Sequence, residues 1–150
     1  MNNLILIRHG QSIWNLERRF TGWAEVDLTD HGKSEAKYAG QLIKKLNIEF
    51  DVYFTSVQIR AIDTLEIILD ILNKKNSEIK KAWELNERHY GALTGLNKDE
   101  MMKKLGKKQV HIFRRSWNVP PPTMKKTHPN HPSKNKTYIN IPTDKMPDSE

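Results

Sequence analysis

Arg8, His9 and Gly10 are the neighbouring residues of this sequence whose types best suit the handling of a phosphoryl group. A neutral histidine ring nitrogen can attack phosphorus, and an adjacent arginine neutralises the charge that develops on the phosphoryl oxygens. Glycine has no Cβ, so a phosphate can approach its backbone closely. A histidine held by hydrogen bonds at the end of a strand explains the same tripeptide equally well. The three residues therefore predict either a phosphoryl-transfer site or an ordinary strand end.

A regular alternation of strands and helices is predicted to position these residues. The four aliphatic residues 4–7, directly before Arg8, predict a strand buried on both faces. Two later segments repeat apolar residues at spacings of three and four, which predicts helices, and Thr29 is a candidate N-cap for the first. After the first strand, the predicted elements are a helix through residue 46, a strand at 50–56, a helix at 58–72 and a strand at 79–85. This order is typical of a parallel sheet with crossover helices, which binds ligands at the carboxyl ends of its strands.

The remaining segments are predicted to be loops and short helices. Residues 11–29 are polar and aromatic with no sustained helical face, which is typical of a functional loop or a disordered one. Beyond the last predicted strand, the pattern predicts short helices at 99–105 and 108–117. The prolines of residues 119–147 exclude helix and central strand there, so we expect a long irregular excursion.

Length and composition limit the number of domains and the class of protein. A chain of 150 residues with 37% hydrophobic residues can bury one sizeable core, so we expect a single domain over 1–150, with a β/α core at 1–86 and covering loops and helices at 87–150. Cysteine is absent, so no disulfide framework or thiolate metal site is expected. No signal peptide or membrane span is recognised, and we expect a cytoplasmic protein. The formal net charge of +7 favours anionic partners, which are nucleic acid, a membrane surface or phosphorylated metabolites.

Five segments together decide between the two interpretations of the opening tripeptide. In chain order they are LIRHGQSIWNLERRFTGW, DLTDHG, FTSVQIRAIDT, ELNERHYGALTGLNK and FRRSWNVPPP. Taken in this order they resemble cofactor-dependent phosphoglycerate mutase of the histidine phosphatase superfamily, over essentially the whole chain. The resemblance implies a three-layer α/β/α parallel-sheet fold of the phosphoglycerate mutase type. It also implies interconversion of 3-phosphoglycerate and 2-phosphoglycerate through a phosphohistidine primed by 2,3-bisphosphoglycerate, with no metal.

The resemblance assigns roles to individual residues. It implies that His9 is the nucleophile, that Arg8 and Arg60 clamp the transferring phosphoryl group, and that Glu87 is the general acid and base. Further substrate-binding residues implied near the phosphate or the glycerate are Gly10, Gln11, Ser12, Asn15, Thr21, Gly22, Arg88, Tyr90, Lys98, Arg114 and Arg115. It gives no role to four histidines, which we expect in turns or on the surface: His31, His111, His128 and His131. The implied partners are small phosphorylated glycerates and a second copy of the chain in a homo-oligomer, with no nucleic acid or membrane.

The sequence departs from the family at its carboxyl end. Members of the family continue through a long helix into a central strand that ends in a second motif of the HGN type, whereas this chain stops at Glu150. We therefore expect a fold that is incomplete at the C-terminus, in which the first strand lacks a neighbour and leaves backbone groups unpaired. Three functions stay open. They are a mutase in a short and impaired form, a phosphatase of the same superfamily that acts on small phosphate esters, and a non-catalytic remnant that binds anions or a partner chain.

Overall fold

The computed structural model describes residues 3–150 and shows two compact units. The first unit contains residues 1–13 and 26–85, and the second contains residues 14–25 and 86–150. The short helix α1 (Ile13–Leu16) lies where the chain passes from the first unit to the second. The expectation of one domain over residues 1–150, divided at residue 86, stays a prediction.

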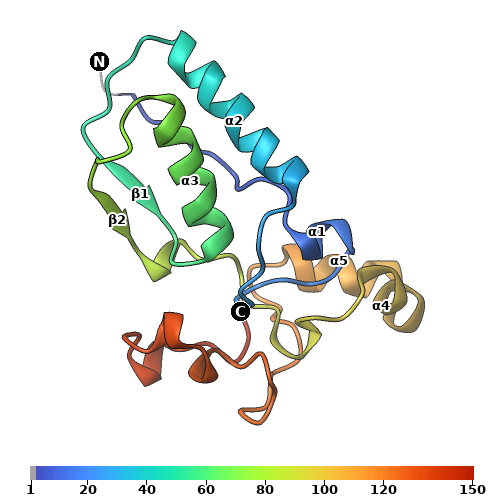
Figure 1. The fold of residues 1–150 in the computed structure, drawn as a ribbon. Helices are drawn as coiled ribbons and strands as arrows, with labels where there is room; N and C mark the ends of the chain where they lie inside the picture. Colours follow the sequence, from blue (N-terminus) through green and yellow to red (C-terminus); the bar gives the residue numbers. More distant parts are fainter. Residues whose placement is uncertain (1–2) are drawn as a thin grey trace. The chain divides into compact units, whose positions relative to one another are not determined.

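The first unit is an α/β structure, as the order of apolar patterns predicts (Figure 1). Strands β1 (Tyr53–Thr55) and β2 (Ile79–Lys81) pair in parallel, and helices α2 (Asp30–Lys45) and α3 (Ile59–Ile71) pack against each other. The chain enters α2 through Thr29, whose side-chain oxygen accepts from the backbone N–H of Gly32, which confirms the predicted N-cap. Both strands are shorter than predicted, and a 3₁₀ turn at Trp83–Leu85 takes the place of the second strand's carboxyl end.

The prediction of a buried strand at residues 4–7 is wrong. In Figure 1 only β1 and β2 are drawn as strands, and within the described residues the sheet has these two strands alone. Leu4 and Leu6 are 81% and 85% exposed, and Ile7 is 43% exposed. A run of aliphatic residues becomes a strand only where a neighbouring strand pairs with its backbone N–H and C=O groups, and 4–7 have no such ladder in the described structure. His9 therefore follows a segment outside the sheet instead of a sheet strand.

The second unit has little regular structure beyond two short helices around an apolar core. Helix α4 (Lys98–Leu105) starts at Asn97, whose side chain caps two N–H groups, and α5 (Lys107–Arg115) follows after Gly106 at φ +85. Both helices agree with the predicted ones. The buried core residues of this unit include Phe20, Tyr90, Leu93, Met101 and Val110. Residues 119–147 contain 3₁₀ turns and no α-helix or strand, as their prolines predict.

Candidate active site

The ring of His9 is held at both nitrogens by groups of the first unit. Nδ1 lies 2.7 Å from the carbonyl oxygen of Gly10, and Nε2 lies 3.3 Å from Nε of Arg60. A carbonyl can only accept and an arginine N–H can only donate, so these contacts require the proton on Nδ1 and the lone pair on Nε2. The geometry thus selects the neutral tautomer whose nucleophilic nitrogen, Nε2, faces a cation.

Arg60 is fully buried at the start of α3, with 0% of its surface exposed. Its Nη2 donates to the side-chain oxygen of Gln58 at 2.8 Å, and its carbonyl accepts from the hydroxyl of Thr64 at 2.7 Å. A buried guanidinium is stabilised where its N–H groups meet acceptors, and the contacts of Nη2 with Gln58 and of Nε with His9 fix its plane. The resemblance implies that His9 and Arg60 meet at one phosphoryl group, and the structure brings the two together without a strand before His9.

Gly10 connects the His9 segment to the same helix. Its backbone N–H donates to the hydroxyl of Thr64 at 3.1 Å, so one threonine bonds both Gly10 and Arg60. Ser12 is fully buried and forms an antiparallel bridge with Leu28. A cavity of about 190 Å³ opens beside these residues; it is lined by Ile7, Arg8, His9, Gly10, Glu35, Ala36, Ala39 and Thr64. The residues of the first unit that are predicted to bind the phosphoryl group therefore lie together around His9. The side chain of Arg8 is exposed there.

A second cavity of about 350 Å³ lies away from His9. It is lined by Phe50, Asp51, Val52, Tyr53, Lys74, Ser77, Glu78 and Lys80, around the amino ends of β1 and β2. Ligands of parallel sheets bind at the carboxyl ends of the strands, so the smaller cavity beside His9 is the better candidate.

Several predicted residues of the second unit lie around one turn. Gly22 has φ +53, and a Cβ on it would approach the backbone N of Tyr90 to 3.1 Å and the carbonyl oxygen of Arg88 to 3.2 Å. The guanidinium of Arg88 donates to the carbonyls of Glu150, at 2.7 Å, and Val119, at 3.2 Å, and also to that of Ser116. These contacts hold Arg88 against the backbone of its own unit.

The other predicted residues of this unit are placed as follows. Tyr90 packs edge to face on Phe20, and burial together with the charge of Glu87 raises the pKa of its phenol. The ammonium of Lys98 lies 5.8 Å from the centre of the Phe20 ring. In α5, Nε of Arg114 is buried and finds no hydrogen-bond partner in the described structure, while Arg115 is exposed. Thr21 is buried, and Asn15 and Glu87 are half-buried.

The four histidines left without a role differ in their surroundings. His31 and His111 are exposed and His128 is half-buried. His131 lies at the end of a turn, where its backbone N–H donates to the carbonyl of His128, and it is buried, with only 3% of its surface exposed. Its Nε2 lies 2.8 Å from Asp148 Oδ1, and its Nδ1 lies 2.7 Å from the Ser133 hydroxyl. A polar partner at each ring nitrogen offsets the cost of burying the histidine. His131 and Asp148 are 17 positions apart, so local sequence patterns do not predict their contact.

Residues that the sequence analysis missed also hold the His9 segment. Thr64 bonds Gly10, and Glu35 accepts from the backbone N–H of Gln11 at 2.8 Å. Gly32 lies so close that a Cβ on it would approach the carbonyl oxygen of Gln11 to 2.1 Å. The segment DLTDHG carries a signal for this contact, because a glycine in the first turn of a helix permits close backbone approach.

Charge is divided unequally between the two units. The first unit carries ten Lys and Arg against ten Asp and Glu, so the whole net charge of +7 belongs to the second unit. Across residues 3–150, no group of three or more histidine or acidic side chains is arranged to hold a metal ion. The described helices also include none with the length and apolar character of a membrane span.

Comparison with known proteins gives consistent matches. Residues 4–130 match the histidine phosphatase superfamily (branch 1). The chain is 55% identical over 150 residues to the 2,3-bisphosphoglycerate-dependent phosphoglycerate mutase of Pelagibacter ubique (strain HTCC1062), covering all of this chain and 63% of that protein. It is 52% identical over 150 residues to the protein of the same name from Hydrogenobaculum sp. (strain Y04AAS1), covering all of this chain and 61% of that protein. The chain thus spans about three fifths of the length of these curated relatives.

A solved structure supports the same fold. The crystal structure of phosphoglycerate mutase from Bacillus anthracis str. Sterne is similar with a TM-score of 0.62 and 27% identity, covering 70% of this chain and 47% of that one. This similarity confirms the predicted α/β fold of the phosphoglycerate mutase type. The roles assigned to individual residues stay predictions.

Proposed function

We propose that this chain, which belongs to the histidine phosphatase superfamily (branch 1), carries the phosphoryl-transfer centre of a 2,3-bisphosphoglycerate-dependent phosphoglycerate mutase. The relatives from Pelagibacter and Hydrogenobaculum, 55% and 52% identical, bear that name. The reaction interconverts 3-phosphoglycerate and 2-phosphoglycerate in glycolysis and gluconeogenesis, in the cytoplasm. Its partners are small phosphorylated glycerates and, in an assembled form, further copies of the chain.

One observation carries the proposal: the lone pair of His9 Nε2 faces the buried guanidinium of Arg60 at 3.3 Å. A nucleophilic nitrogen beside a fixed cation suits attack on an anionic phosphoryl group, because the cation neutralises charge on the phosphoryl oxygens as it develops. The hydrogen bond from Nδ1 to the Gly10 carbonyl keeps the proton on Nδ1 and the lone pair on Nε2, so Nε2 can act as the nucleophile without a separate base.

The donor set at His9 also fits a bisphosphorylated primer. Arg60 is a buried cation beside Nε2 of His9, and Arg8 is an exposed cation on the wall of the cavity beside it, so both carry the charge that phosphate oxygens attract. 2,3-Bisphosphoglycerate, when bound, supplies the phosphoryl group that primes the enzyme. The chain's own residues hold that group between Arg8 and Arg60, and His9 carries it between substrates.

The second unit supplies the proposed acid–base and glycerate-binding groups. Glu87 moves a proton to and from the substrate hydroxyl. Two observations support an anion-binding site in this unit. The unit carries the whole net positive charge of the chain, and the N–H at Nε of Arg114 is buried without a hydrogen-bond partner in the described structure. The residues proposed to contact the substrate there are Asn15, Thr21, Gly22, Arg88, Tyr90, Lys98, Arg114 and Arg115.

Labelling with 2,3-bisphosphoglycerate tests the proposed function. Incubating the chain with the ³²P-labelled compound is expected to give an acid-labile, base-stable phosphoprotein, as a phosphorylated histidine ring requires. The label is expected to disappear in His9→Ala and to persist in His111→Ala, an exposed histidine of α5. Release of inorganic phosphate without formation of 2-phosphoglycerate would indicate the phosphatase, and label that persists unchanged in His9→Ala would place the nucleophile elsewhere.

Replacing Arg60 is expected to weaken the binding of 2,3-bisphosphoglycerate. Arg60→Ala removes charge-assisted hydrogen bonds, which should cost about 1.5 to 3 kcal/mol of binding free energy. Arg60→Lys should restore only part of it, because lysine lacks the planar fork. Isothermal titration calorimetry measures the affinities, and thermal melts show whether each variant is folded, since Arg60 is fully buried. Equal affinity in the wild type and a folded Arg60→Ala would remove Arg60 from the site.

A further inference from the structure

The peptide group between Gly10 and Gln11 joins His9 to a carboxylate that the sequence analysis gave no role. Its carbonyl oxygen lies 2.7 Å from His9 Nδ1, and its N–H donates to Glu35 Oε2 at 2.8 Å. A trans peptide is planar, and its N–H and C=O point in opposite directions. A carboxylate that fixes the direction of this N–H therefore also fixes the direction of the carbonyl that holds the histidine ring.

We propose that Glu35 is a positioning residue for His9 and acts on it through the Gly10–Gln11 peptide. The proposal rests on the proposed role of His9 as the phosphoryl carrier. Glu35 does not touch the ring nitrogen that reacts. It selects the orientation and tautomer of the ring from the other side of one peptide bond.

The surrounding backbone leaves this peptide little freedom. A Cβ on Gly10 would lie 2.2 Å from the carbonyl oxygen of Gly32, and a Cβ on Gly32 would lie 2.1 Å from that of Gln11. The two backbones are therefore in direct contact, and only glycine at both positions permits it. Thr29 N also donates to the carbonyl oxygen of Gln11 at 2.9 Å. The first turn of α2 thus holds the segment after His9 from one side, while Glu35 reaches it from the next turn.

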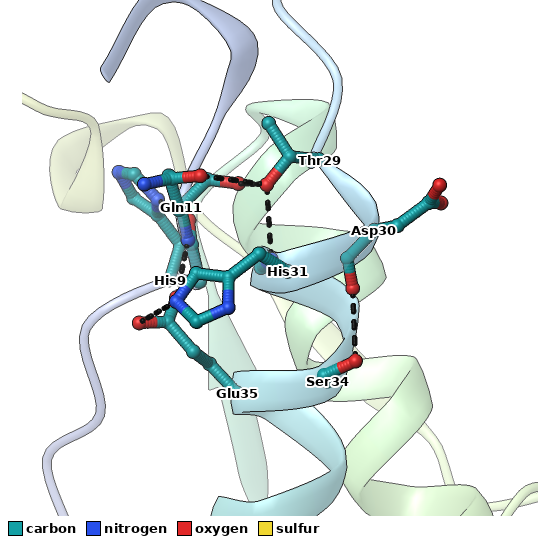
Figure 2. Close-up of polar contacts among 9 residues, drawn as sticks. His9, Gln11, Thr29, Asp30, His31, Ser34 and Glu35 are labelled. Carbon is teal, nitrogen blue, oxygen red and sulfur yellow. Dashed lines mark hydrogen bonds and ion pairs between the residues drawn. The ribbon is translucent and has the colours of Figure 1, made fainter. Parts of the chain in front are cut away.

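Figure 2 shows the contacts of the Glu35 carboxylate with the ring of His31 and with the backbone of Gln11. The second oxygen of the carboxylate, Oε1, lies 3.4 Å from Nε2 of His31, one turn earlier on α2. The carboxylate is thus held on both sides, although about half of the Glu35 side chain, 48%, is exposed. Replacing Glu35 therefore removes a contact at a half-exposed position on the wall of the cavity beside His9, and it leaves no void in a buried core.

The same arrangement has an electrostatic consequence for the ring. A carboxylate bonded to the peptide N–H polarises the peptide, which makes the Gly10 carbonyl a stronger acceptor for the Nδ1 proton. When Nε2 bonds to phosphorus and the donor's oxygen leaves with the electron pair, the ring keeps its Nδ1 proton and becomes positive. The polarised carbonyl, with the negative charge of Glu35 behind it, stabilises that positive ring, as outer carboxylates stabilise metal-bound histidines.

Nitrogen NMR of the imidazole rings tests the proposal on the full 150-residue chain. With ¹⁵N-labelled histidine, and with a His9→Gln sample to assign the His9 signals, the wild type is expected to show the neutral Nδ1–H tautomer at His9. Glu35→Ala should increase the share of the Nε2–H tautomer. Glu35→Gln keeps an accepting oxygen without the charge, so it should fall between the two. Glu66→Gln, an exposed glutamate of α3, is the matched control and should leave the tautomer unchanged.

The rate of His9 phosphorylation by 2,3-bisphosphoglycerate gives a second readout. Removing an outer carboxylate that orients a histidine typically costs about 10- to 100-fold, so we expect a loss of that size in Glu35→Ala. The affinity for the anionic compound should not decrease, because the variant removes a negative charge from the cavity wall. The melting temperature should change by no more than about 2 °C, because Glu35 is exposed and substitutions at exposed positions change stability little. An unchanged His9 tautomer in folded Glu35→Ala would overturn the proposal. The tautomer is measured without substrate, so a wild type that fails to phosphorylate would contradict the proposed function alone.

Discussion

Fusing this chain at its carboxyl end to the part of the Pelagibacter ubique relative that lies outside the match is expected to raise mutase turnover by about 10²- to 10⁴-fold. The chain covers 63% of that relative, and Leu4 and Leu6 are more than four-fifths exposed without a backbone ladder. His9 follows this segment directly. Pairing the segment with a further strand would fix the backbone that leads into the nucleophile.

The magnitude combines two effects. A misplacement of about 1 Å at a reacting atom can cost roughly 10²-fold in rate. The resemblance to phosphoglycerate mutases also implies a second histidine at the transferring phosphoryl group, and a missing donor there typically costs about 10²- to 10³-fold. The upper limit of the expected gain in turnover applies if the short chain suffers both losses and they compound in part. The lower limit applies if only one of them operates.

An enolase-coupled assay compares the 150-residue chain with the fusion. The matched control is the same fusion with His9→Ala, which should be inactive and so excludes activity from a contaminant. Hydrogen exchange at residues 4–7 supplies an independent measurement, because strand pairing should slow exchange of these amides in the fusion. Comparable turnover in the short chain and the fusion would contradict the expectation, and so would an unchanged exchange rate.

Acidification is expected to destabilise the fold through His89. The side chain is fully buried, and its Nδ1 accepts from the backbone N–H of Gly91 at 3.1 Å. Burial, followed by the charges of His131 and His128, lowers the pKa of His89 from 6.5 to about 4, against an opposing effect of Asp148. Between pH 6.5 and about pH 4, the unfolded chain therefore binds a proton on His89 that the folded chain does not bind.

The sign and size of the effect follow from this linkage. The contribution of the neutral, buried His89 to the free energy of unfolding is fully present above pH 6.5. It falls as the pH decreases and reaches its minimum near the pKa of about 4 in the folded chain. At about 1.36 kcal/mol for each unit of pKa, the loss is about 3 kcal/mol. This is a large share of the ~5 to 15 kcal/mol that stabilises a typical domain.

Urea unfolding at about pH 7.5 and about pH 4.5 measures the loss. His89→Asn cannot titrate, and its side-chain oxygen can still accept from Gly91, so this variant should lose less stability on acidification than the wild type. His111→Asn, at an exposed position of α5, should behave as the wild type does. Because carboxylates titrate in all three proteins, the comparison between them isolates His89. Equal losses in the wild type and His89→Asn would show that this histidine does not control acid stability.

Local patterns predicted the helices of this chain well because the interactions that start and cover them lie within a few residues. The Thr29 cap and the apolar spacings within α2 and α3 are set by neighbours along the chain, and so is the break at Gly106 between α4 and α5. The prediction of a strand at residues 4–7 failed for the opposite reason. Its stability depends on a partner strand, and four aliphatic residues predict burial without showing what would bury them.

The candidate site divides in the same way. The sequence by itself determined the membership of the family and the residue types that can do chemistry, His9, Arg8 and Arg60, because these depend on composition and order along the chain. Only the tertiary structure decided that Arg60 meets Nε2 of His9 and that Glu35 meets the peptide beside it. It also decided that the net charge of +7 lies in one unit. The residues in these contacts are separated by 51 and 24 positions, and close approach over such distances is determined by how the helices pack and by where glycine lets two backbones touch.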